Sequence, residues 1–75
     1  MAMSRDRFRL ACRLLRNGGH LARLDLPGQR PGESPIDWLV RHGLAPDAYT
    51  AAEMLCLGAG LRSQLDELEA LGVTV

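Results

Sequence analysis

Two cysteines and two histidines are the side chains of this chain best suited to metal binding or redox chemistry. Zinc sites usually bring their ligands in short pairs such as C-x2-C or H-x3-H, whereas Cys12, His20, His42 and Cys56 are scattered. Both cysteines stand among apolar neighbours in predicted helices, which is typical of buried free thiols in a reducing compartment. We therefore expect no metal, no cofactor and a cytoplasmic protein, while a Cys12–Cys56 disulfide stays open as an alternative.

Nucleophilic catalysis would need a serine or cysteine beside a histidine and a carboxylate. Ser4, Ser34 and Ser63 are each explained better as caps of helices, and Gly58-x-Gly60 lacks the lysine or third glycine of a phosphate-binding loop. A domain of 75 residues buries only about 60% of the surface of its unfolded chain, which leaves little to support a water-excluding active site. The sequence therefore predicts that the protein is not an enzyme.

Arginine is the remaining side chain with strong binding chemistry, because all nine basic residues of the chain are arginine. A guanidinium group binds carboxylates and phosphates through two parallel hydrogen bonds. Four arginines fall within about 80° of one another on one side of a predicted helix. We call these four residues the Arg face: Arg5, Arg9, Arg13 and Arg16.

Charge is segregated along the chain although the formal net charge is zero. Residues 1–31 carry a balance of +5 and residues 32–75 a balance of −5. In the favoured interpretation the two halves neutralise each other, within one molecule or across a dimer, with the Arg face near Asp66, Glu67 and Glu69. In the alternative, the Arg face is free and binds an acidic partner, because like charges four residues apart on a helix are mildly unfavourable.

The elements that position these side chains are predicted to be helices, since fourteen Leu and nine Ala outnumber four apolar β-branched residues. One helix is expected over 5–17, ended by Gly18 and Gly19. A second begins at the Ser34 cap with Pro35 in its first turn and ends at Gly43. Between these two helices, 27–34 is expected to be a loop with two Pro-Gly turns.

The third helix is expected to run continuously over 50–71, or from near Pro46, because one apolar stripe keeps its phase through Gly58 and Gly60. A break at Gly58–Arg62, with Ser63 capping a fourth helix, is the alternative. The stripe is predicted to pack against another helix or a second copy of the chain, and its members are Met54, Leu57, Leu61, Leu65 and Leu68.

Residues 20–26 alternate weakly between apolar and polar side chains, and two interpretations of this segment stay open. It could pair with 73–75 as a short two-stranded β element, or it could be an extended loop. The predicted fold is therefore a mainly α, three-helix single domain over 1–75, with this β pairing as an optional addition.

The predicted function is non-catalytic binding of another protein, as a small regulator or inhibitor that occludes a surface. Trp38, Tyr49 and the arginines of the Arg face are residue types enriched at interface hot spots. The surplus of Leu suggests an apolar face, and a homodimer is one use of it that stays open. The competing prediction is a nucleic-acid-associated regulator that uses the Arg face. No apolar run approaches the length of a membrane span, and the composition suggests a GC-rich bacterial or phage genome.

Overall fold

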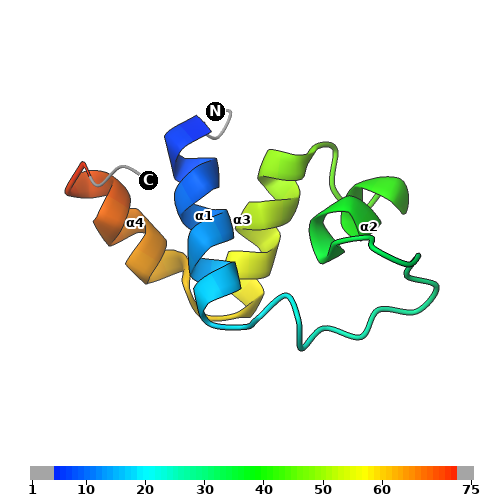
Figure 1. Ribbon diagram of the computed structural model, residues 1–75. Helices are drawn as coiled ribbons and strands as arrows, with labels where there is room; N and C mark the ends of the chain where they lie inside the picture. The colour runs from blue at the N-terminus through cyan, green and yellow to red at the C-terminus, as the bar shows by residue number, and fades with distance from the viewer. Residues whose placement is uncertain (1–4, 73–75) are drawn as a thin grey trace.

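The computed structural model describes residues 5–72 and consists of four α-helices joined by turns (Figure 1). They are α1 (Arg5–Asn17), α2 (Pro35–Arg41), α3 (Ala48–Gly58) and α4 (Arg62–Ala70). In Figure 1, α1 and α3 run in the same direction, and α4 returns in the opposite direction on the other side of α1. Among the helices, α2 packs against α3 alone. The expected mainly α fold is confirmed, with four helices in place of three.

The core lies where the four helices meet, and it includes Ile36 of α2 and Ala45 of the turn before α3. Alanines with no exposed surface, Ala11 on α1 and Ala51 and Ala52 on α3, line these contacts, and their small side chains let the helices approach closely. Larger side chains fill the remaining space, and the three most completely enclosed are Leu15, Cys56 and Leu65. All of the core side chains are therefore apolar, and ionic groups are kept to its edge.

The first three helices end in one shared glycine motif. The glycine after each helix has a positive φ of 69–74°, which a side chain would strain. The next residue then donates its N–H to the carbonyl five positions earlier, as in a Schellman motif. The three glycines with their following hydrogen bonds are Gly19 (His20 to Leu15, 2.9 Å), Gly43 (Leu44 to Leu39, 3.0 Å) and Gly60 (Leu61 to Cys56, 2.8 Å).

The expectation of one continuous helix over 50–71 is wrong, because the Gly60 motif ends α3 and turns the chain back along α1. The alternative break is present, but α4 starts at Arg62 and has Leu61 rather than Ser63 at its N-cap, without a side-chain cap. At the other end, α3 begins at Ala48, where the Asp47 carboxylate accepts the Thr50 N–H at 2.7 Å.

Residues 20–26 form turns and irregular chain, and no strand occurs within 5–72. After Gly19 the chain coils for a further turn, since the Arg23 N–H donates to the Gly19 carbonyl at 3.3 Å. The proposed partner segment, 73–75, lies outside the described residues. Within the described part of the chain, the extended-loop alternative is thus closer to the structure than the β pairing.

The loop over 27–34 is held against α2 by side chains. Arg41 donates through Nε and Nη2 to the two carboxylate oxygens of Glu33, at 2.7 and 2.8 Å, and through Nη2 to the Gly28 carbonyl at 2.9 Å. This hydrogen bonding lowers the pKa of Glu33 to about 2. Ser34 caps α2 as expected, by accepting the Asp37 N–H at 3.2 Å.

Candidate functional site

All four residues of the Arg face are exposed, on the side of α1 that points away from the core. The opposite side of the same helix buries Leu10, Ala11 and Leu15 against α3 and α4. Within residues 5–72, none of the four arginines forms an ion pair or a side-chain hydrogen bond. The structure therefore brings the four predicted residues together on one exposed side of α1.

Arg7 is the arginine of α1 that neutralises the acidic half of the chain. Its side chain is only 12% exposed and reaches toward α3 and α4. Its Nε donates to Oε2 of Glu53 at 2.9 Å, and Nη2 pairs with the other oxygen of this carboxylate. Its Nη1 lies 2.7 Å from Oδ1 of Asp66 and 3.0 Å from Oε1 of Glu69.

Hydrogen bonding to Glu53 raises the pKa of Arg7, and the same contact lowers the pKa of the Glu53 carboxyl group. The favoured interpretation of the charge segregation, that the halves neutralise each other, thus describes Arg7 rather than the Arg face. The sequence signal was visible, because Arg7 is the arginine of the helix that interrupts its apolar side.

A shallow apolar hollow of about 280 Å³ borders the Arg face along the line where α1 meets α4. Leu14 and Leu68 supply partly buried apolar surface, and Arg13 stands among the lining residues. Charged and apolar surface therefore lie next to each other, which is the combination that protein interfaces use for orientation and for affinity.

The two aromatic residues predicted to contact a partner differ in exposure. Trp38 is only 8% exposed, its Nε1 donates to the Pro27 carbonyl at 2.9 Å, and its ring lies 4.1 Å from the ring of His42. Its hydrogen-bonding group is thus used within the molecule. Tyr49 is 37% exposed and contacts Phe8 edge to face, with ring centroids 4.8 Å apart. Tyr49 can therefore contact a partner without rearrangement.

The predicted packing stripe is divided by the break between α3 and α4. Leu65 has no exposed surface, and Leu61 and Leu68 pack against the core within the chain. Met54 and Leu57, by contrast, are exposed on the outer side of α3. Only these last two remain on the surface of a single chain.

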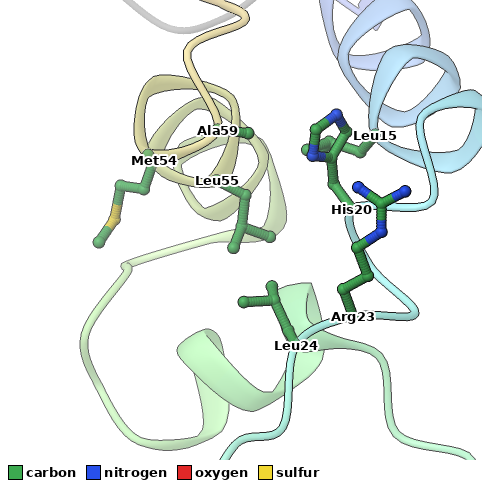
Figure 2. A pocket seen from close by; sticks show the side chains of 8 residues that line it. Leu15, His20, Arg23, Leu24, Met54, Leu55 and Ala59 are labelled. Carbon is green, nitrogen blue, oxygen red and sulfur yellow. The ribbon is translucent and has the colours of Figure 1, made fainter.

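A cleft between the end of α1, the turn at 20–24 and α3 is a surface that the sequence reasoning missed (Figure 2). Its walls combine apolar side chains with His20 and Arg23. The available signal was the pair of glycines before His20, which predicts a sharp turn, but sequence alone does not show that this turn faces α3.

Both cysteines are free thiols in the structure. Burial raises the pKa of Cys12, and it raises the pKa of Cys56 to about 11. Such thiols are poor nucleophiles at neutral pH.

Among residues 5–72, no group of three or more His, Cys, Asp or Glu side chains could hold a metal ion. In the same part of the chain, every helix is too short or too polar to cross a membrane.

The site and fold together define a small, mainly α-helical domain with an exposed basic helix face. No protein-family model matches this chain, and no curated protein or solved structure shows significant similarity to it.

Proposed function

We propose that this chain is a non-catalytic protein-binding domain whose Arg face binds an acidic surface of a partner protein. The proposal rests on the different surroundings of the arginines on α1. Arg7 pairs with the nearby carboxylates, whereas the Arg face is exposed and unpaired within residues 5–72. Unpaired guanidinium groups attract an acidic partner over distance and orient it on contact.

Affinity would come from apolar surface next to the Arg face, in the hollow between α1 and α4. A domain this small acts most simply by covering a surface of its partner, as a regulator or inhibitor. The free thiols fit a reducing compartment, and we place the protein in the cytoplasm on that basis. A homodimer stays an alternative use of the exposed Met54 and Leu57.

The competing function is nucleic-acid binding through the same Arg face. The formal net charge of zero and the acidic residues of α4 weaken this alternative, because a nucleic acid repels carboxylates. The salt dependence of the binding affinity distinguishes nucleic-acid binding from protein binding. A phosphate binder that uses four arginines should lose affinity with a log–log slope of about −3 to −4, whereas an interface with a large apolar share should depend less on salt.

The experiment is affinity capture from a lysate, with and without nuclease, by the wild-type chain and by charge variants. We expect Arg9→Glu/Arg13→Glu to lose the partner and Arg9→Lys/Arg13→Lys to keep it. For single reversals of equal net charge, Arg30→Glu, which lies away from the Arg face, is the matched control for Arg13→Glu. Capture that disappears with nuclease, or that survives reversal of Arg9 and Arg13, would contradict the proposal.

A further inference from the structure

The cleft between α1 and α3 has a volume of about 320 Å³ and is open to solvent on one side. Figure 2 shows Leu15, Leu24 and Leu55 around its apolar interior, with Met54 at the edge. Small residues keep the cleft open at the end of α3. A Cβ atom added at Gly58 would meet no atom within 4 Å.

Two basic side chains, His20 and Arg23, form the wall of the cleft opposite α3 (Figure 2). The His20 ring packs over Gly18, where a Cβ atom would lie only 2.4 Å from Nε2, and the Arg23 guanidinium lies near Gly19. Neither side chain forms an ion pair or a side-chain hydrogen bond within 5–72, and no carboxylate lines the cleft. The cleft is therefore apolar inside and basic along one wall.

Apolar surface continues from the cleft along the outside of α3. Met54 is 41% exposed, and Leu57, one helical turn further on, is 58% exposed. A small ligand that fills the cleft would contact Met54 but leave Leu57 uncovered. An amphipathic helix presents apolar side chains at similar spacing and could cover both residues together with the cleft.

We propose that this cleft binds an acidic amphipathic helix of a partner protein. One apolar side chain of that helix enters between Leu15 and Ala59, its neighbours cover Met54, and a carboxylate pairs with Arg23. The inference rests on the proposed protein-binding function and adds the structural class of the partner segment. Charge complementarity favours an acidic helix as the partner segment, because its carboxylates can pair with the unpaired Arg23 guanidinium whereas a basic helix would be repelled.

The test is an NMR titration of the ¹⁵N-labelled full chain with a synthetic acidic peptide of about four helical turns. The peptide carries Leu at positions i, i+3 and i+7 and mainly Glu elsewhere. Two control peptides have Lys in place of Glu, or the same composition in scrambled order. We expect saturable shifts centred on 15–24 and 54–59, and binding of both control peptides at least about tenfold weaker.

Two variants test the cleft itself. Gly58→Leu places a side chain in the open space, and Arg23→Glu reverses the charge of the wall. Each should weaken peptide binding about tenfold. Matched changes at exposed positions away from the cleft, Ala70→Leu and Arg30→Glu, should leave binding unchanged. Circular dichroism spectra of all four variants should match that of the wild-type chain, which separates loss of binding from loss of fold.

The inference is overturned by the absence of saturable shifts, by shifts centred on the Arg face, or by equal binding of the Lys peptide. It is equally overturned if decanoate alone shifts the NMR resonances of the cleft residues, because the cleft would then be a site for a small amphiphile. Shifts that depend on protein concentration without peptide would indicate a second copy of the chain. If capture of the partner is lost in the Arg9 and Arg13 variants but kept in Gly58→Leu, the proposed function of the Arg face stands and the cleft has no part in it. If capture is lost in Gly58→Leu but kept in the Arg9 and Arg13 variants, the cleft binds the partner and the proposed role of the Arg face is wrong.

Discussion

Arg7 on α1 and Glu53 on α3 form a two-pronged ion pair at the edge of the core. Nε of Arg7 donates to one oxygen of the Glu53 carboxylate at 2.9 Å, and Nη2 pairs with the other oxygen. The remaining nitrogen, Nη1, contacts Asp66 and Glu69 on α4. A single guanidinium group therefore links three helices, and most of its side chain is shielded from solvent.

Arg7→Met should lower the free energy of unfolding by about 1–3 kcal/mol, because it leaves the partly buried Glu53 carboxylate with only the more distant Arg62, whose Nε lies 3.9 Å away. Arg9→Met, on the exposed side of the same helix, should change it by no more than about 0.5 kcal/mol. Urea unfolding followed by circular dichroism measures both. Equal effects of the two substitutions would show that Arg7 has no special role in linking the helices.

The pair between Glu33 and Arg41 should contribute stability that depends on pH. The pKa of Glu33 is about 2 in the folded chain against an ordinary value of 4.5, so folding favours its charged form. The contribution is complete above pH 4.5 and is lost as the pH falls toward 2. The stability difference between the wild-type chain and Arg41→Met should therefore be constant above about pH 5 and shrink below it. Arg5→Met, at an unpaired position, is the control; a difference for Arg41→Met that stays constant down to pH 2 would contradict the assignment.

The two glycines that flank Ala59 should respond in opposite directions to alanine. Gly60 has a φ of +74°, so Gly60→Ala should cost about 1–2 kcal/mol. Gly58 lies at the end of α3 without a positive φ and with open space at its Cβ position, so Gly58→Ala should stabilise by about 0.4–1 kcal/mol. Thermal unfolding of both variants decides between this structure and a continuous helix, in which both substitutions would stabilise.

Sequence patterns predicted the helices with conventional ends and failed where two signals conflicted. Gly19 and Gly43 follow helices whose apolar pattern stops, and both were recognised as helix ends. Gly60 has the same conformation, but the Leu stripe continued beyond it in phase and favoured a continuous helix. The apolar pattern reports only that a side chain is buried. The positive φ of Gly60, with the Leu61 N–H bonded to Cys56, sends the chain back along α1 so that Leu65 enters the same core.

The candidate site was predicted in part for a similar reason. The exposure of the Arg face follows from helical periodicity, which depends on local sequence alone. Which arginine meets the acidic half, by contrast, depends on how α4 packs, and that is set by the turn at Gly60. The cleft beside α3 also requires tertiary structure, because residues 20–24 and 54–59 approach each other only when α1 and α3 are side by side.

The two thiols should differ in reactivity, in the order of their burial. Cys56 has no exposed surface and a pKa raised to about 11, so its thiolate is scarce and inaccessible at pH 8. Cys12 is partly exposed, and its pKa is raised by burial as well, so it should react more slowly than a free thiol but faster than Cys56. In a reaction with a disulfide reagent at pH 8, Cys12→Ser should abolish the faster phase and Cys56→Ala should keep it. The slow phase should accelerate in urea as the core opens, since reaction of Cys56 requires unfolding. Equal rates for both thiols in the native chain would mean that the contact of α1 with α3 opens far more readily than a packed core allows.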